Sequence, residues 1–153
     1  MKLSDILSPD AICTNLVSKD KEGVLRELVD HLAKIHPEID RERLVEVLLA
    51  RERLGSTGLE HGVAIPHGKL PGIDRILACF GRSLEGVPFE AMDGKPSHIF
   101  FLLVAPENSA GTHLKVLARV SRLVKEPSFR KRLMQAGSRE ELYELIVSED
   151  ERF

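Results

Sequence analysis

One segment sets the class of fold, and it reads Ser97-His98-Ile99-Phe100-Phe101-Leu102-Leu103-Val104-Ala105. From Ile99 onward it is apolar without interruption, which is typical of a β-strand covered on both faces. The step Asp93-Gly94 marks a turn before it, and a second β-rich stretch runs from Arg75 to Ser83. Seven apolar residues fall far short of the ~20 that span a bilayer, so we expect no direct membrane insertion.

Helical patterns lie on both sides of these strands in the sequence. Apolar residues at three- and four-residue spacing predict amphipathic helices from Asp20 to about Ile35 and from Asp40 to about Leu54. Three more helical patterns follow the strands, at residues 111–125, 128–135 and 138–147, the last opened by a capping box of Ser138 and Glu141. We therefore expect one layered α/β domain over residues 1–153, with helices on both sides of a mostly buried sheet.

Composition excludes several classes of function. The chain carries 22 basic and 24 acidic residues, so a generic polyanion binder is not expected. With no Trp and one Tyr it lacks the stacking platforms of a protein that binds single-stranded nucleic acid. Cys13 and Cys79 lie far apart, which argues against a disulfide framework and a thiolate zinc site. The N-terminus lacks the apolar core of a signal peptide, and we expect a cytoplasmic protein.

The charge is unevenly distributed along the chain. Residues 115–132 hold seven basic side chains and one acidic side chain, a local net charge of +6. Two solvated helices whose basic residues favour their C-terminal ends would explain this excess. A docking face for an acidic partner is the alternative, and the sequence favours the solvated helices.

Residues 55–72 form the segment in which we expect the chemistry. Five glycines and two prolines fall within these 18 residues, around a strand-like Val63-Ala64-Ile65. A loop of this composition inside one domain is more often functional than idle. His67 follows this strand and a proline, and an imidazole with an ordinary pKa near 6.5 is mostly neutral and nucleophilic at pH 7. We expect Gly68 to leave the ring uncrowded for an approaching macromolecule.

Other residues near this segment suit a phosphoryl group. The Ser56-Thr57-Gly58 loop offers hydroxyl and backbone N–H donors, and Arg51 offers a planar fork matched to phosphate oxygens. His113 lies close to a predicted helix N-terminus, which favours an anion. Together they suit a covalent phosphohistidine, with His67 as nucleophile, better than a metal site.

Two interpretations of other classes stay open at this point. A metal-dependent hydrolase would use His61, His67 and His113 with Glu60 as ligands, although the helical H-E-x-x-H pattern is absent. A non-catalytic anion-sensing domain would use the same glycine-rich loop without forming a covalent bond. His31, His36 and His98 have no motif around them, and we assign them no function.

The segment resembles the enzyme IIA proteins of the bacterial phosphotransferase system, in the fructose/mannitol class and most closely in its nitrogen-regulatory type. The resemblance extends over nearly the whole chain. It rests on Arg51-Glu52, Ser56-Thr57-Gly58, Gly62-Val63-Ala64-Ile65-Pro66-His67-Gly68, Thr112-His113-Leu114 and Glu140-Glu141-Leu142-Tyr143. It implies a mixed sheet of about five strands flanked by helices on both sides, and a phosphoryl relay without cofactor or metal.

The resemblance also implies the roles of residues and partners. An HPr- or NPr-type phosphocarrier would phosphorylate His67 on Nε2, with Arg51 and His113 flanking the group and the Ser56-Thr57-Gly58 loop beside them. The group would then pass to the cysteine of a IIB domain in sugar transport, or its presence would control binding to regulatory target proteins. A single domain with nitrogen-type motifs and without a transmembrane segment favours the regulatory role.

One residue departs from the family pattern. Glu60 stands where the family often has glycine, and a carboxylate ~4 Å from a phosphoryl charge would repel it by about 4 kcal/mol at an effective dielectric constant of 20. We therefore expect Glu60 to point to solvent, where screening weakens the repulsion. We expect His61, its neighbour, to be a solvated loop residue.

Overall fold

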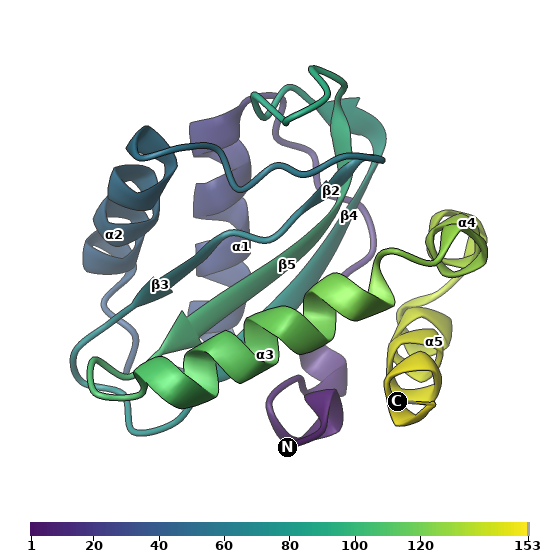
Figure 1. Ribbon diagram of the computed structural model, residues 1–153. Coiled ribbons are helices and arrows are strands. Elements are labelled where there is room, and N and C mark those ends of the chain that lie inside the picture. Colours follow the sequence, from purple (N-terminus) through teal and green to yellow (C-terminus); the bar gives the residue numbers. More distant parts are fainter. Residues whose placement is uncertain (153) are drawn as a thin grey trace.

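The computed structural model describes residues 1–152, and it places a mixed β-sheet between two layers of helices (Figure 1). In Figure 1, α1 and α2 cover one face of the sheet and α3 crosses the other. The elements in chain order are η1 (Leu3–Asp5), η2 (Pro9–Ala11), β1 (Ile12–Cys13), α1 (Lys21–Ile35), α2 (Arg41–Arg53), β2 (Val63–Ala64), β3 (His67–Lys69), β4 (Leu77–Val87), β5 (Ser97–Ala105), α3 (Ala110–Leu123), α4 (Pro127–Gln135) and α5 (Arg139–Glu151).

Strand β5 is the central strand of the sheet. Its long antiparallel neighbour is β4, which in turn pairs with β1 in parallel. On the other edge β5 pairs in parallel first with β2 and then with β3. The mixed five-stranded sheet with helices on both sides is therefore confirmed.

The apolar run in β5 is buried on both faces, as its sequence predicts. Successive side chains of a strand point to opposite faces, so alternate residues enter two different cores. Ile99, Phe101 and Leu103 lie in the core beneath α3, α4 and α5. Phe100, Leu102 and Val104 lie in the core beneath α1 and α2.

Helix boundaries follow the expected capping chemistry. The carboxylates of Asp20 and Asp40 accept the N–H groups of Gly23 and Arg43 at the starts of α1 and α2. Ser138 accepts the N–H of Glu141 at the start of α5. The capping box is only half formed, because the carboxylate of Glu141 accepts the N–H group of Gly137 and not that of Ser138.

Four features of the fold differ from the sequence expectation. Strand β4 continues to Val87, and α5 continues to Glu151 because Asp150 is buried near its end, where it accepts the N–H of Leu3 at 2.7 Å. Strand β1 was not expected, since two residues show no alternation that a pattern can reveal. His67, expected in a loop after a strand, is the first residue of β3.

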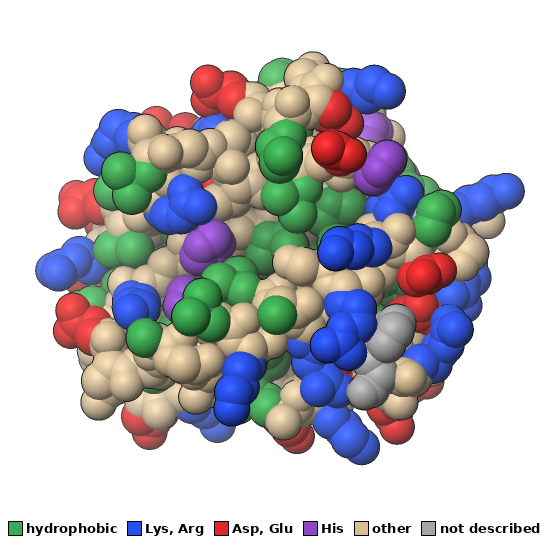
Figure 2. All heavy atoms as spheres, viewed as in Figure 1, with side chains coloured by type: hydrophobic (Ala, Val, Ile, Leu, Met, Phe, Trp, Pro, Cys, Tyr) green, Lys and Arg blue, Asp and Glu red, His purple; other side chains and the backbone are tan. Residues whose placement is uncertain are grey.

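The basic segment fits the interpretation of solvated helices in part. Arg119 pairs with the buried Asp150, and Arg132 pairs with Glu149 at 3.4 Å. Arg130 donates to two carbonyl oxygens just after α3, at 2.7 and 2.9 Å. Exposed lysine and arginine side chains (blue) nevertheless gather over α3 and α4 in Figure 2. Among the described helices, none is long and apolar enough to cross a membrane.

Candidate functional site

His67 is held at the start of β3 with one ring nitrogen engaged. β3 pairs with β5 so that His67 lies opposite Leu103. Nδ1 of the half-buried ring lies 2.8 Å from the carbonyl oxygen of Ile65. A neutral imidazole that donates its proton there keeps a lone pair on Nε2. Burial lowers the pKa of His67, and the positive charge of Arg51 lowers that pKa further, so the neutral form prevails at pH 7.

Gly68 serves helix packing, which corrects the role that the sequence suggested for it. A Cβ atom built at position 68 would lie 2.7 Å from Cγ1 of Val47 on α2, closer than two carbon atoms can pack. The missing side chain therefore lets α2 approach β3. Neighbouring residues of a strand point to opposite faces of the sheet. The α-carbon of Gly68 therefore faces α2, whereas the ring of His67 points toward α3.

His113 stands against His67 on α3, three residues after the first residue of the helix. The two ring centroids are 5.5 Å apart and the rings are nearly perpendicular, at 79°. His113 is only 6% exposed, and its Nε2 atom has no hydrogen-bond partner among the described residues. Burial lowers the pKa of His113, as do the nearby His67 and Lys69. A buried polar atom without a partner is costly, which marks this nitrogen as a place for an incoming group.

Arg51 lies in the last turn of α2 and borders the same site. One guanidinium nitrogen donates to the carbonyl oxygen of Gly55 at 2.8 Å, which directs the side chain along the loop. Arg51, Thr57, His67 and Leu117 belong to the lining of a hollow of about 240 Å³. Figure 2 shows histidine side chains (purple) beside a hollow with hydrophobic side chains (green), between the α2 end of the molecule and α3.

Ser56 and Thr57 of this loop line the hollow, but both hydroxyl groups and the N–H groups of Thr57 and Gly58 already donate inside the protein. The hydroxyl of Ser56 donates to the carbonyl oxygen of Phe89 at 2.8 Å and accepts the N–H of Gly58 at 3.0 Å. Both the N–H and the hydroxyl of Thr57 donate to the carboxylate of Glu52. Direct donation from this loop to a phosphoryl group stays a prediction, because these donors would first have to leave their present acceptors.

Glu52 is the residue of this site that the sequence did not single out. Its side chain is 4% exposed, and besides Thr57 it binds the ammonium group of Lys21 at 2.9 Å. Its neighbour Arg51 was assigned to the site, but α2 directs the two side chains differently. In the sequence, Glu52 stands out only as the neighbour of Arg51 in the Arg51-Glu52 motif. Its partner Lys21 lies 31 residues earlier, too far away for a local pattern to predict the contact.

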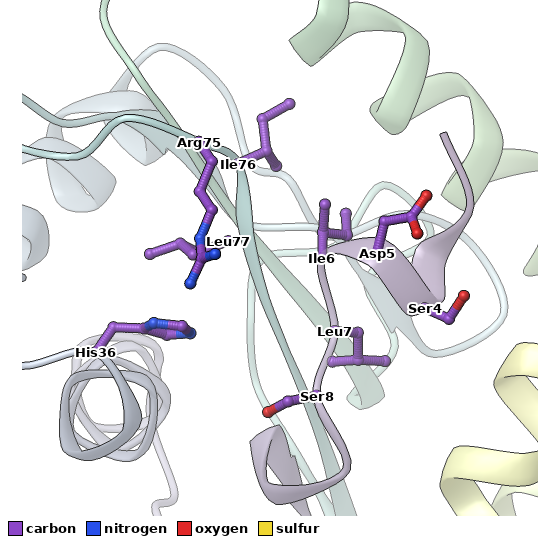
Figure 3. A pocket seen from close by; sticks show the side chains of 9 residues that line it. All are labelled: Ser4, Asp5, Ile6, Leu7, Ser8, His36, Arg75, Ile76 and Leu77. Atoms are coloured by element: carbon purple, nitrogen blue, oxygen red, sulfur yellow. The ribbon is translucent and has the colours of Figure 1, made fainter.

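The other titratable candidates lie outside this hollow. Glu60 and His61 are exposed, as expected of solvated loop residues, and Oε2 of Glu60 lies 3.7 Å from Nε2 of His61. Within residues 1–152 no three His, Cys, Asp or Glu side chains gather as a metal site requires, so the ligand set of the hydrolase hypothesis is not assembled. A separate hollow of about 120 Å³ lies between η1, the end of α1 and the start of β4; His36 and Arg75 line it (Figure 3).

The comparisons with known proteins agree on one family. The family model for "Phosphoenolpyruvate-dependent sugar phosphotransferase system, EIIA 2" matches residues 5–149. A nitrogen regulatory protein from Bradyrhizobium diazoefficiens is 39% identical over 147 residues, which cover 96% of this chain and 95% of that protein. The fructose-specific EIIABC component from Bacillus subtilis is 38% identical over 98% of this chain, which spans only 24% of that larger protein.

The fold leads to the same family. The crystal structure of the nitrogen regulatory protein IIA-Ntr from Neisseria meningitidis superposes with a TM-score of 0.88 at 36% sequence identity. The superposition covers 94% of this chain and 98% of the Neisseria chain.

Proposed function

The chain belongs to the EIIA 2 family of the phosphoenolpyruvate-dependent sugar phosphotransferase system, and from this membership we propose that it carries a phosphoryl group on Nε2 of His67. The donor is an HPr- or NPr-type phosphocarrier protein. The hydrogen bond from Nδ1 of His67 to the carbonyl oxygen of Ile65 is the observation that carries the proposal. It fixes the tautomer and leaves Nε2 as the nucleophile at the hollow.

The transfer balances without a separate proton donor or base. The lone pair on Nε2 of His67 attacks phosphorus in line, and the N–P bond to the histidine of the carrier breaks with its electron pair returning to that ring. His67 keeps its proton on Nδ1, so the phosphorylated ring is cationic and the carrier ring, cationic before transfer, becomes neutral. The hydrogen bond to Ile65 suits this state, because a cationic ring is the stronger donor.

Arg51 and His113 stabilise the charge that spreads over the phosphoryl oxygens. Arg51 borders the hollow with a guanidinium group, which matches two oxygens at once. His113 contributes the buried Nε2, for which a phosphoryl oxygen supplies the missing partner when that nitrogen carries the proton. The proposal requires neither a cofactor nor a metal ion. Transfer from the isolated phosphorylated carrier to this chain should therefore proceed in the presence of EDTA at the rate measured without it.

We assign the domain to the nitrogen-regulatory branch, working in the cytoplasm. Two relatives named nitrogen regulatory protein match this chain nearly end to end, at 39% and 34% identity. In this role the phosphorylation state of His67 controls binding to regulatory target proteins. Sugar transport, with transfer to the cysteine of a IIB domain, is the second candidate, and the 38% identity to the fructose-specific component favours it.

Mass analysis after incubation with phosphoenolpyruvate, enzyme I and an HPr-type protein tests the relay. We expect one acid-labile phosphoryl group per chain, absent from His67→Ala. A wild-type chain that binds phosphate but forms no adduct would instead be an anion-sensing domain. Adding a fructose-type IIB domain to the phosphorylated chain separates the two branches, because only the transport role predicts rapid transfer to the IIB cysteine.

A further inference from the structure

A lysine from the first turn of α1 lies beneath the wall of the hollow. Its ammonium group is 2.9 Å from Oε1 of Glu52, 3.2 Å from Oε1 of Glu90 and 4.7 Å from the centre of the Phe89 ring. The Lys21 and Glu52 side chains are 15% and 4% exposed, whereas Glu90 is 82% exposed. Lys21 and Glu52 therefore form a nearly buried ion pair, to which Glu90 adds a solvated contact.

This ion pair lies one contact away from the residues that line the hollow. Glu52 accepts the N–H and the hydroxyl of Thr57, and Lys21 lies 3.5 Å from the hydroxyl of Ser56. Both residues also contact Phe89: the ammonium group of Lys21 lies over its ring, and the hydroxyl of Ser56 donates to its carbonyl oxygen. The loop is thus bonded to a carboxylate whose one cationic partner within residues 1–152 is the mostly buried Lys21.

A carboxylate at this place creates an electrostatic conflict for a phosphoryl carrier. The negative charge of Glu52 acts on His67, since it raises the pKa of that imidazole against the larger effect of burial. The same charge repels a dianion on Nε2 of His67, because like charges repel each other at short range. Holding Thr57 therefore conflicts with accepting phosphate unless the carboxylate is neutralised.

We propose that Lys21 is a positioning residue for phosphoryl transfer at His67: it neutralises Glu52, so that the carboxylate holds the Thr57 wall without repelling the phosphoryl group. This inference rests on the proposed function of His67. Lys21 does not touch the phosphoryl group and acts through Glu52 alone. Without Lys21, the carboxylate either stays ionised and repels the group, or takes up a proton on one oxygen and gives up one of its two bonds to Thr57.

Phosphorylation by phosphoramidate, a small-molecule donor, measures this role without the docking of a carrier protein. We expect Lys21→Met to slow the formation of phosphohistidine by about 10- to 100-fold, the range for a slightly misplaced catalytic wall. The double variant Lys21→Met/Glu52→Gln should recover most of the rate, because the Gln amide keeps an acceptor for Thr57 and carries no charge. A double variant as slow as Lys21→Met would overturn the proposal.

An exposed pair on the same helix supplies the matched control. Arg26 and Glu22 of α1 lie 3.1 Å apart and are 43% and 58% exposed. Arg26→Met/Glu22→Gln removes this pair, and with it the exposed contact of Arg26 with Glu42 of α2 at 3.1 Å, without touching the loop, and its rate should equal that of the wild type. All rates are taken well below the melting temperature of the least stable variant.

Titration of the His67 ring by NMR gives a readout that a merely structural role would not move. Arg51 and Glu52 act on the pKa of His67, the titratable ring of His113 lies against it, and Lys69 acts on His113; among these groups only Glu52 changes in Glu52→Gln. We expect Glu52→Gln to lower the pKa of His67, and the double variant to return it to the wild-type value. An unchanged pKa in Glu52→Gln would contradict the inference.

A wild-type chain that phosphoramidate leaves unmodified would refute the proposed function itself, whereas equal rates for wild type and Lys21→Met would refute only the role of Lys21.

Discussion

Two walls flank His67, one on the α2 side and one on the α3 side, and they differ in how their polar groups are satisfied. On the α2 side, Glu52 accepts two bonds from Thr57 and a third from Lys21, so the wall is closed within the protein. On the α3 side, Nε2 of His113 is buried without a partner among the described residues. His67 lies between the walls and is anchored through Nδ1, while none of residues 1–152 binds its Nε2.

This difference separates support from reaction. A closed hydrogen-bond network fixes geometry, and its removal costs stability. A buried polar atom without a partner costs stability in the free protein, and the incoming group repays it. We therefore expect changes in the α2 wall to affect folding as well as transfer, and changes in the α3 wall to affect transfer with little cost in stability.

The largest expected effect on folding is that of Glu52→Ala. It removes the acceptor of Thr57 and, among the described residues, leaves the mostly buried Lys21 with the exposed Glu90 as its one anionic partner. Breaking a buried ion pair on one side costs about 3–5 kcal/mol of unfolding free energy. Urea denaturation measures it, with the exposed Glu22→Ala of α1 as the control, expected to change stability by less than about 1 kcal/mol. A loss equal to that of Glu22→Ala would mean that the α2 wall is not closed in solution.

For His113 we expect a loss of transfer rate without a loss of stability. His113→Ala should still accept phosphate at His67 but should slow its onward transfer by about 100-fold, the effect of removing one donor to a developing charge. His113→Phe keeps a ring against His67 and removes the unpartnered nitrogen, so it should unfold at the same urea concentration as the wild type or a higher one. Rapid-quench kinetics with a IIB domain or the carrier protein as acceptor give the rate. Loss of acceptance as complete as in His67→Ala would contradict this division of roles.

Gly68→Ala tests the contact that brings α2 to the site. The added methyl group meets Val47 at 2.7 Å, and overpacking of this kind costs about 1–3 kcal/mol. Val47→Ala in the same chain should recover most of this loss, because it removes the atom that clashes. Thermal unfolding of the two single variants and the double variant forms the cycle. Additive losses would show that α2 does not press on β3 at this point.

The smallest expected effect is a pH dependence of stability from the two rings. Burial lowers the pKa of both His67 and His113 from 6.5, so below that value the unfolded chain binds more protons than the folded one. Their contribution to stability is complete above pH 6.5 and is lost as the pH falls through the folded-state pKa values. The unfolding free energy of the wild type should therefore fall more steeply on acidification than that of His67→Gln/His113→Gln. Parallel curves from urea denaturation would contradict the lowered pKa values.

Most of the fold could be predicted because its signals are local. The unbroken apolar run of β5 and the Asp and Ser caps of the helices are readable from neighbouring residues. Strand β1 could not be predicted, because two residues carry no period and pair only through contact with β4. The C-terminal extension of α5 could not be predicted either, because the N–H group of Leu3, at the far end of the chain, binds the carboxylate of Asp150.

The candidate site divides in the same way. His67, Arg51 and His113 lie in motifs, and the structure brings His67 beside each of the other two. Their chemical roles stay predictions until phosphorylation is measured. Lys21 and Glu52 were missed because their pairing depends on how α1 packs beside α2. The reason for Gly68 was missed because a glycine in a sequence does not show which neighbour requires it.

Mass and NMR analysis of the phosphorylated chain tests the central claim most directly. After incubation with phosphoenolpyruvate, enzyme I and an HPr-type carrier, we expect a single phosphoryl group on Nε2 of His67, with the proton on Nδ1 still shared with Ile65. A phosphoryl group on Nδ1, on another residue or on no residue of the wild-type chain would contradict it.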